Sequence, residues 1–496
     1  MKIFTAAQIR EWDKYTIKEE SITSVDLMER AGTACFKWIK KNISATKHII
    51  ICCGTGNNGG DGLAIARLLH LAKYKVTIYI LNNKKSSTEF AVNLDKAIAL
   101  KINTIYVSTN KDMPAFSKNM VIIDALFGTG LNRPLKTIAT QFVNCINKSE
   151  LQVISIDIPS GLFSDGFSAD PAIVNATHTL TFEVKKYAFL LPENTIYTGE
   201  VHVLDIELSK KFYANETVLF ETIDKQTIKN IYKPRNELAH KYNFGNALLY
   251  AGSKNMMGAA VLCAKACIRS GTGLVTLNVT PDCEAIVHIS IPEVITTSEK
   301  VTNKTLLKKA AIAIGPGLEN NIKNMQLLTK LLTDWQKPIV IDATALSLLI
   351  TLKHLLPNRK LHPAILTPHT GEFEKLFGKT TDPFQRIQLA IDSAVSLQCY
   401  IILKGPNTFI ACPDGKHFFN TTGNAGMATA GSGDTLTGII CGLLAQAYSE
   451  KEACILGVYL HGLAGDIAAE KLSQEAMIAS DIIDNIGQAF LKIKKY

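Results

Sequence analysis

Two stretches of this chain alternate short apolar strands with helical segments, and this alternation limits the possible folds more than any other feature. The first stretch runs from Lys47 to about Asp205, and the second starts at Asn246. Strands that alternate with helices pair in parallel and place helices on both faces of the sheet. At 496 residues, the chain is also too long for a single domain of ~150 residues. The sequence therefore predicts two α/β domains, each a parallel sheet between layers of helices.

The pattern assigns elements as follows. In the first stretch, strands are expected at 48–53, 75–81, 120–125, 152–158, 177–183 and 200–205, with helices at 60–73 and 88–100. Residues 1–45 have the apolar spacing of two amphipathic helices. In the second stretch, strands are expected at 247–251, 274–279, 311–314, 338–342, 364–367 and 400–404, with long helices at 259–270, 434–447 and 451–472. The charged segment 208–231 lacks this rhythm, so the domains are placed at 1–212 and 225–496.

The composition is that of a folded, core-forming protein, with 47% hydrophobic and 20% charged residues. The net charge of +9 includes no long basic block, so nothing indicates nucleic-acid binding. The eleven cysteines form no Cys-x-x-Cys pair and fit buried thiols in a reducing compartment. The first residues lack a signal-peptide core, and no apolar run approaches the ~20 residues of a membrane helix. We expect a cytoplasmic protein that does not bind membranes.

A glycine-rich loop at 424–433 precedes the predicted helix that begins at Asp434. Unpaired amides at a helix start, together with the helix dipole, form a binding site for phosphate. An aspartate there can take a proton from a hydroxyl that attacks a phosphoryl group. Lys404 ends a strand, where its cation can meet the same phosphate. The alternatives are a structural turn with Asp434 as its N-cap, and a surface lysine. The pattern favours a phosphorylated ligand.

A second glycine cluster, Gly54–Gly62, follows the first predicted strand. It therefore lies at the carboxyl end of the sheet, where open α/β folds bind ligands. Its spacing differs from Gly-x-Gly-x-x-Gly, which argues against a hydride-transfer site. The loops 124–131 and 157–161 end at the same rim, so Asn58, Asp124 and Ser160 could converge as oxygen ligands of a hard cation. Taken singly, each loop could equally be a structural turn.

Four motifs in order, Leu27–Gly32 and these three loops, resemble the NAD(P)H-hydrate epimerase domain over roughly residues 1–210. The resemblance implies a Rossmann-like three-layer α/β/α sandwich, with Asn58, Asp124 and Ser160 as potassium ligands. It also implies that Asp157 is the acid/base group that interconverts R and S hydrates. Alternatively, Asp157 caps the turn that follows it. The residues implied to contact the hydrated nucleotide are Asn57, Asn58, Gly59, Gly60, Asp61, Gly128, Thr129, Gly130, Leu131, Asn132, Arg133, Pro134 and Asp157.

The segments between roughly 240 and 470, among them Gly271–Thr276, resemble the ADP/ATP-dependent NAD(P)H-hydrate dehydratase of the ribokinase-like superfamily. Ala259, Gly317, His369 and Asp434 would meet the hydrated cofactor, and magnesium would assist. His369 could instead be a structural histidine. Glu319 and Thr344 depart from the glycine and aspartate usual in that family. The residues implied to bind ADP or ATP are Lys404, Gly405, Pro406, Asn407, Thr408, Asn424, Ala425, Gly426, Met427, Ala428, Thr429, Ala430, Gly431, Ser432 and Gly433.

Together, the two resemblances imply a bifunctional repair enzyme that epimerises NAD(P)H hydrates and dehydrates the S form with ADP or ATP. One alternative is a vitamin or sugar kinase fused to a nucleotide-binding regulatory domain, because a fold does not fix a function. Another makes the front domain a non-catalytic interaction module. The product distinguishes kinase from dehydratase, since only a dehydratase releases phosphate and reduced nicotinamide. An apolar, alanine-rich surface on the last helices predicts a homo-oligomer.

Overall fold

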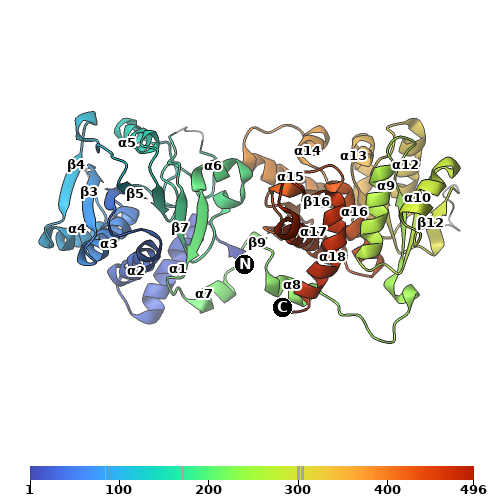
Figure 1. Cartoon of the computed structure of the whole chain (residues 1–496), viewed down its shortest axis with the longest axis horizontal. Helices are drawn as coiled ribbons and strands as arrows, with labels where there is room; N and C mark the ends of the chain where they lie inside the picture. The colour runs from blue at the N-terminus through green and yellow to red at the C-terminus, as the bar shows by residue number, and fades with distance from the viewer. Residues whose placement is uncertain (84, 169–171, 299–301, 303–305) are drawn as a thin grey trace. The chain divides into compact units, whose positions relative to one another are not determined.

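The computed structural model describes residues 1–83, 85–168, 172–298, 302 and 306–496. It divides the chain into two compact units, Lys2–Val218 and Leu219–Tyr496, with Met1 joined to the second. Each unit has its own sheet and its own core (Figure 1). The division lies between the two predicted domain ranges. The C-terminal unit starts before the expected residue 225, because β9 (Phe220–Thr222) pairs with β18 (His417–Phe419) in its sheet.

The described part of the N-terminal unit holds a seven-stranded sheet of order β4-β3-β2-β5-β6-β7-β8, and every neighbouring pair is parallel. Its strands are β2 (His48–Cys53), β3 (Lys75–Leu81), β4 (Asn103–Val107), β5 (Met120–Ala125), β6 (Val153–Ile156), β7 (His178–Phe182) and β8 (Glu200–Leu204). Its helices are α1 (Ala6–Glu20), α2 (Ser24–Asn42), α3 (Asn57–Leu71), α4 (Thr88–Ala99), α5 (Thr137–Lys148), α6 (Thr195–Thr198) and α7 (Lys210–Asn215), and a short strand β1 (Lys2–Ile3) precedes them.

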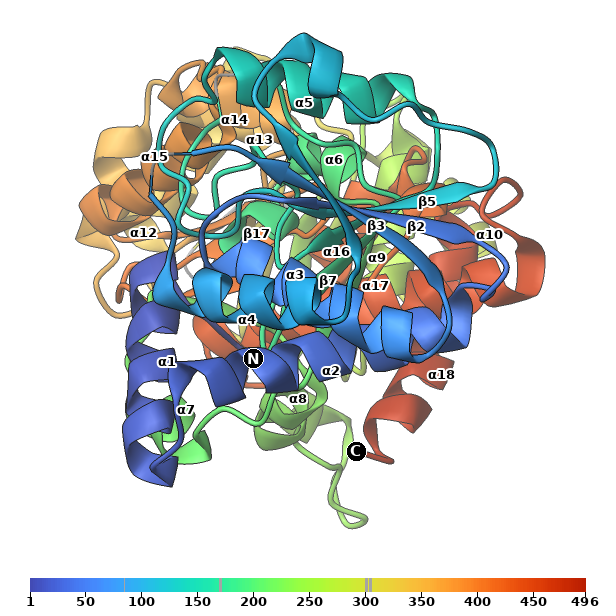
Figure 2. The same ribbon diagram turned by 90° about the vertical axis from the view of Figure 1, so that its left-hand side faces the viewer.

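Helices cover both faces of this sheet, as alternating strands and helices require. On one face, Leu63 of α3 and Phe90 of α4 pack against Ile51 of β2, together with Ile39 of α2. On the other face, Phe142 of α5 packs against the neighbouring Ile50 side of β2. Figure 2 shows α2, α3 and α4 on one side of the strands and α5 on the other. The prediction of a parallel sheet wrapped on both faces is confirmed.

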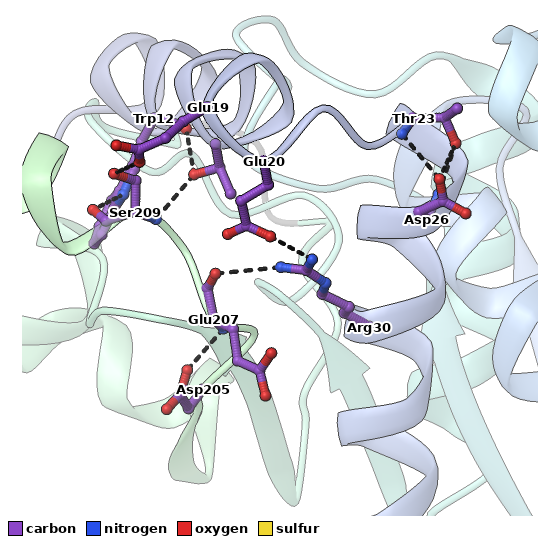
Figure 3. Close-up of polar contacts among 10 residues, drawn as sticks. Trp12, Glu19, Glu20, Thr23, Asp26, Arg30, Asp205, Glu207 and Ser209 are labelled. Carbon is purple, nitrogen blue, oxygen red and sulfur yellow. Dashed lines mark hydrogen bonds and ion pairs between the residues drawn. The ribbon is translucent and has the colours of Figure 1, made fainter.

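Helix α1 is held against the segment that follows β8 (Figure 3). The indole Nε1 of Trp12 donates to the carbonyl of Ser209 at 2.9 Å, and the Ser209 amide donates to Thr16 Oγ1 at 3.0 Å. The Ser209 hydroxyl also donates to Glu19, and Arg30 of α2 pairs with Glu20. These contacts fix both α1 and residues 205–209 beside the carboxyl end of the sheet.

The C-terminal unit contains a sheet in which the strands follow the order β9-β18-β17-β16-β15-β14-β13-β10-β11-β12. Its remaining strands are β10 (Asn246–Tyr250), β11 (Leu274–Asn278), β12 (Ile295–Thr297), β13 (Ala311–Ile314), β14 (Ile339–Ile341), β15 (Ile365–Leu366), β16 (Tyr400–Leu403) and β17 (Phe409–Ala411). The strands from β16 to β12 in this order pair in parallel, whereas β17 is antiparallel to both of its neighbours.

Helices cover the two faces of this sheet in two groups (Figure 1). One group packs into the main core, and it includes α9 (Met257–Arg269), α16 (Ser432–Ala445), α17 (Glu450–Leu472) and α18 (Ala479–Ile493), with α8 (Lys225–Ile231) and α10 (Glu284–Ser290) at its edges. The other group is α12 (Ile322–Asp334), α13 (Thr344–Leu349), α14 (Thr370–Phe377) and α15 (Pro383–Leu397). Two α/β units are therefore present, as predicted. The C-terminal sheet is mixed rather than wholly parallel, because the hairpin that contains β17 adds antiparallel pairs.

Helix α17 is the one described helix long and apolar enough to cross a membrane, and the sequence reading had expected none. Within the C-terminal unit, 78% of the apolar stretch of α17 is buried, and this stretch packs against α16 and α18. It is therefore the central helix of a core. The same burial occupies the apolar surface from which self-association was expected.

Several boundaries differ from the predicted ones. Helix α3 begins at Asn57 rather than at residue 60, so part of the expected glycine loop is helical. Helix α16 begins at Ser432, two residues before Asp434. The segment 208–231 is not a plain linker, because it contains α7, β9 and α8. The strands β4, β12, β17 and β18 were not predicted; three of them have only three residues, too few for a clear period.

Candidate active sites

The N-terminal sheet has a switch point between β2 and β5. From β2 the chain adds β3 and β4 on one side, then returns to add β5 on the other. Loops on the two sides of such a point diverge and leave a crevice at the carboxyl ends of the strands. The loops there approach closely, since a Cβ on Gly54 would lie 2.0 Å from the Leu126 carbonyl oxygen. The loops at the strand ends predicted a site at this position, and the structure has a topological crevice there, between β2 and β5.

A cavity of about 950 Å³ opens at this crevice. Its wall includes most of the residues predicted to contact the nucleotide, together with Asp13 of α1 and Lys186 after β7. Gly59 and Gly60 are buried beneath it, and a Cβ on Gly59 would lie 1.8 Å from the Gly54 carbonyl oxygen. The predicted residues on the wall are Asn57, Asn58, Asp61, Gly128, Thr129, Gly130, Leu131, Asn132, Arg133, Pro134 and Asp157.

Two of the three predicted potassium ligands, Asp124 and Ser160, are bonded to each other, and the loop after β5 links them to Asn58. In this loop the Phe127 amide donates to the Ser160 hydroxyl at 2.8 Å, and a Cβ on Gly128 would lie 3.3 Å from the Cβ of Asn58. Asp124 is fully buried, and it accepts from the Ser160 hydroxyl at 2.6 Å and from the Ser160 amide at 2.9 Å. Burial raises the pKa of Asp124, and these hydrogen bonds oppose that rise. Asn58 is buried, with neither its side-chain oxygen nor its nitrogen bonded to another described protein group. A buried amide without partners is costly, so this position fits one that a ligand completes.

Asp157 lies directly after β6 in a left-handed conformation with φ of 65°. Aspartate tolerates this region better than most residues. Its carboxylate is 3.0 Å from Nζ of Lys186, a lysine with only 1% of its side chain exposed. The amide of Ser160, in the turn after Asp157, is bonded by Asp124 instead. The arrangement thus favours a charge pair on the cavity wall over the alternative that Asp157 caps its own turn.

Two further carboxyls of the cavity wall share this field. Burial, and then the charge of Asp157, raise the pKa of Asp13 to about 7, while Lys186 lowers it. Burial also raises the pKa of Asp61, with Asp157 and Asp13 adding to the rise. Burial and mutual repulsion therefore favour the protonated forms of Asp13 and Asp61. Such a cluster can both give and take a proton.

In the C-terminal unit the strand order reverses between β10 and β13. The loops after these strands meet, as the Gly252 amide donates to the Pro316 carbonyl at 2.8 Å. Gly317 has φ of 64°, and a Cβ there would lie 3.0 Å from the Cβ of Ala259. Ala259 and Gly317, both predicted to meet the cofactor, are therefore neighbours at a second topological crevice.

The glycine loop ends at the start of α16. Gly431 has a φ of 86° and provides no side-chain cap. The Ser432 amide donates to the Thr429 carbonyl at 3.4 Å, so the amides of Gly433 and Asp434 are the ones at this helix start that a ligand can use. The loop is anchored by Asp466 of α17, which accepts from the Gly423 amide and the Asn424 side chain, both at 3.0 Å. Asp466 therefore holds the start of the glycine loop against α17.

Charged side chains converge on the same end of α16. Lys404 Nζ is 2.8 Å from the buried carboxylate of Asp342 and 3.9 Å from Glu372. A Cβ on Gly433 would lie 3.1 Å from that Nζ, so the lysine lies against the glycine loop. Burial lowers the pKa of Lys404, but Asp342, Glu372 and Asp434 together raise it above its usual value. This cation stays charged where phosphate would bind.

Asp434 lies in the first turn of α16, within this group of charges. Burial raises its pKa to about 6, and Asp342 and Glu372 contribute to the rise while Lys404 opposes it. Asp342 is occupied by Lys404 and by the Thr437 hydroxyl, which donates to it at 2.6 Å. Asp434 is therefore the carboxylate of this group placed to accept a proton near neutral pH.

His369 caps α14, and its Nδ1 accepts from the amides of Gly371 and Glu372. The structural alternative is thus present, yet 61% of the His369 side chain remains exposed and its Nε2 lies 3.5 Å from Glu372. The Nδ1 edge of the ring is fixed by its hydrogen bonds, and the exposed part of the ring can contact a ligand. The backbone of His369 also forms an isolated parallel β-bridge with the backbone of Lys404.

The other predicted nucleotide residues follow β16. Thr408 donates its hydroxyl to the Gly405 carbonyl at 2.9 Å, and Asn407 has a φ of 53°. They form a tight turn, and a Cβ on Gly405 would meet nothing within 4 Å. The turn is open on the side of Gly405, next to Lys404.

We expect Gly431→Ala to destabilise the C-terminal unit by about 1–3 kcal/mol, because φ of 86° is strained for alanine. Its Cβ would also lie 2.3 Å from Leu262 of α9. Gly487→Ala in α18, where a Cβ meets nothing, is the matched control and should stabilise by up to about 1 kcal/mol. Calorimetry of the full chain measures both changes, and an unchanged midpoint for Gly431→Ala would contradict this loop geometry.

Sequence reasoning missed four functional candidates: Asp13, Lys186, Asp342 and Glu372. Asp342 directly follows β14, so the strand-end rule that found Asp124 could have found it. Glu372 is the third residue of a helix capped by His369, which is a recognisable pattern. Two residues depart from those usual in the dehydratase family, Thr344 and Glu319. Thr344 is the first residue of α13 and follows Ala343, which has a φ of 49°. The Glu319 carboxylate accepts a hydrogen bond from the Asn321 side chain at 3.0 Å.

Comparison with known proteins matches both units. The family described as NAD(P)H-hydrate dehydratase matches residues 247–488, and the one described as YjeF-related protein N-terminus matches residues 24–188. The bifunctional NAD(P)H-hydrate repair enzyme Nnr of Moorella thermoacetica is 34% identical over 98% of this chain and 96% of its own length. Its Escherichia coli counterpart is 30% identical, over 98% of this chain and 93% of its own length.

Among solved structures, the ADP/ATP-dependent NAD(P)H-hydrate dehydratase of Bacillus subtilis, co-crystallised with ATP and Mg²⁺, is 31% identical. The match covers 55% of this chain and 98% of that one, with a TM-score of 0.48. The full-length relatives match the two-unit chain almost from end to end. This chain therefore belongs to the family of bifunctional NAD(P)H-hydrate repair enzymes.

Proposed function

We propose that the N-terminal unit interconverts the R and S hydrates of NADH and NADPH, and that the C-terminal unit dehydrates the S form with ADP or ATP. The observation that carries the proposal is that each unit places proton-accepting carboxylates beside an open helix N-terminus at a sheet crevice. A phosphate-bearing, hydroxylated substrate suits both crevices.

In the N-terminal unit, Asp157 takes the proton of the ring hydroxyl. The bond between the hydroxyl-bearing carbon and the ring nitrogen breaks, its electron pair goes to the nitrogen, and a carbonyl forms. Asp13 protonates the nitrogen, and the reverse steps close the ring on the other face. Lys186 lies 3.0 Å from the Asp157 carboxylate and supplies a positive charge beside it. Burial raises the pKa of Asp13 to about 7, so Asp13 can donate a proton near neutral pH.

Potassium fits the N-terminal crevice. Asn58 offers a buried carbonyl oxygen without a described protein partner, and Asp124 and Ser160 offer a carboxylate and a hydroxyl that are bonded to each other. Oxygen donors of this kind suit a hard cation. When bound, potassium would supply positive charge near the substrate phosphates, and these three residues would hold it.

In the C-terminal unit, Asp434 accepts the proton of the substrate hydroxyl, whose oxygen then attacks the terminal phosphorus of ADP or ATP. Lys404 and the open amides of α16 stabilise the negative charge that develops on the phosphate. The nucleotide leaves with one phosphate fewer. The new phosphate ester is a better leaving group than hydroxide, so the lone pair of the ring nitrogen expels it as phosphate. The resulting iminium ion loses a proton from the neighbouring ring carbon, which forms the ring double bond and restores NAD(P)H.

The C-terminal site offers few protein oxygens to a magnesium ion. Asp342 is occupied by Lys404 and Thr437, and Glu372 accepts from the His369 amide at 2.9 Å. Few protein oxygens therefore remain, which agrees with a magnesium ion held mainly by nucleotide phosphates and water. When bound, it would neutralise phosphate charge, and Asp434 and Glu372 are the residues of this site that would hold it.

One assay tests both activities. The full chain is incubated with a mixture of R- and S-NADH hydrate and ADP or ATP, while the absorption band of reduced nicotinamide and free phosphate are measured. We expect complete recovery of NADH, because epimerisation feeds the S form to the dehydratase. Recovery of only the S portion would contradict the epimerase, and a stable phosphorylated product would indicate a kinase.

The pH profile of epimerisation tests the role of Asp13. As the acid, Asp13 must be protonated, and its pKa is raised to about 7, so epimerisation should fall as pH rises through about 7. Asp13→Asn should lower the rate by about 100-fold and remove this limb. Asp95→Asn, on the outer helix α4, is the control. A limb near pH 7 that persists in Asp13→Asn would assign it to another group.

A further inference from the structure

Two histidines and a glutamate gather at the edge of the N-terminal sheet, away from the cavity. His178 begins β7, and Glu200 and His202 lie on β8, the edge strand of this sheet. In the parallel register, His178 pairs with Glu200 and Leu180 with His202. Since residues two apart on a strand share a face, all three side chains lie on one face of the sheet.

The donor atoms of these residues are already close together. His178 Nδ1 lies 3.2 Å from His202 Nε2 and 3.6 Å from an oxygen of Glu200. His202 Nε2 lies 3.7 Å from the same oxygen. Ligands about 2.05 Å from a tetrahedral zinc ion are separated by about 3.4 Å. The three distances therefore describe one face of a tetrahedron.

From this geometry we propose a zinc-type metal site at His178, Glu200 and His202, with water as the fourth ligand. Two imidazoles and one carboxylate are a common zinc donor set. The imidazoles are about three-quarters buried, with 24% and 22% of their side chains exposed, so both rings are largely fixed. The Trp38 ring of α2 packs beside both, at centroid distances of 5.1 and 4.8 Å.

Without a metal, His178 Nδ1 and His202 Nε2 share a hydrogen bond, in which one nitrogen donates and the other accepts. Metal binding replaces the shared proton with a bond to each nitrogen. The site needs little rearrangement, which favours affinity.

The metal acts as a clamp on an edge strand. The far end of β7 leads to Glu183 and Lys186, and the far end of β8 leads to Ile206 and Leu208, all on the cavity wall. Joining the near ends of both strands resists separation of β8 from the sheet. The metal is therefore structural, and it lies at the opposite end of these strands from the cavity.

Cobalt and zinc titration of the full chain tests the site, after removal of any affinity tag and of bound metal. We expect one Co²⁺ per chain, with the intense visible bands of a tetrahedral nitrogen and oxygen site, displaced by one Zn²⁺. His202→Ala and Glu200→Gln should each weaken binding at least about tenfold. His70→Ala, on α3 and outside the cluster, is the matched control and should bind as the wild type does.

Zinc should also raise the unfolding midpoint of the wild type and of His70→Ala by a few degrees, but not that of His202→Ala. Glu200 is 69% exposed, so Glu200→Gln should fold normally and keeps the test valid if His202→Ala does not. Absence of stoichiometric binding overturns the proposal. So does binding that is unchanged in both variants, or a charge-transfer band from cobalt bound to a cysteine thiolate.

Discussion

Replacing Asp434 with asparagine is expected to lower nucleotide-dependent dehydration by about 10³-fold while epimerisation continues at its normal rate. The amide cannot accept the hydroxyl proton, and general-base catalysis typically contributes 10²–10⁴-fold. Fold should be retained, because burial and Asp342 disfavour the ionised carboxylate that the variant removes. The measurement is phosphate release with S-NADH hydrate and ADP or ATP, with epimerisation followed separately on the R form.

The pH dependence gives a second readout of the same residue. A base must be ionised, and the pKa of Asp434 is raised to about 6, so wild-type dehydration should fall as pH drops through about 6. Asp484→Asn on α18, an exposed carboxylate paired with Lys265, is the matched control and should keep the wild-type profile. Normal dehydration by Asp434→Asn would refute the assignment of the base.

Asp157→Asn should affect the other activity: epimerisation should fall by about 10³-fold, whereas dehydration of pure S hydrate should continue at its normal rate. Asparagine tolerates φ of 65°, so the backbone after β6 should be preserved. The variant removes the base and leaves Lys186 without its charge partner. The test follows the ratio of R to S hydrate over time, in the absence of nucleotide.

Asp205→Asn provides the control for this variant, because Asp205 is exposed and lies outside the cavity wall. Lys186→Met separates the two members of the ion pair. If the charge of Lys186 supports Asp157 as the base, Lys186→Met should lower the epimerisation rate while dehydration of pure S hydrate continues. A variant Asp157→Asn that epimerises normally would leave the N-terminal unit without an identified base.

Much of this molecule could be predicted from local patterns. The alternation of strands and helices predicted two parallel sheets, and loops at strand ends placed Asn58, Asp124 and Ser160 together before the structure did. The family inferred from these motifs is confirmed by the comparisons. These predictions succeed because they depend on neighbours in sequence and on one general rule of α/β topology.

The missed features depend on contacts between distant segments. Asp13 reaches the cavity only because Trp12 and Thr16 fix α1 against Ser209, nearly two hundred positions away. Lys186 looks like a surface lysine in sequence but is buried, with Asp157 and the Phe182 carbonyl as partners of its Nζ. The start of α3 was placed too late because glycines disfavour helices, whereas packing of Gly60 on Met28 and Gly62 on Ala125 overrides that preference.

The placement of the cysteines has a practical consequence. Ten of the eleven thiols are buried and Cys145 is half-buried, and burial raises the pKa of Cys399 and Cys412 to about 12. Thiolate is the reactive form, so alkylating reagents should label the native chain slowly and mainly at Cys145. Labelling at other positions would then report local opening of the fold. Mass spectrometry of the modified peptides would show which of the two units opens first.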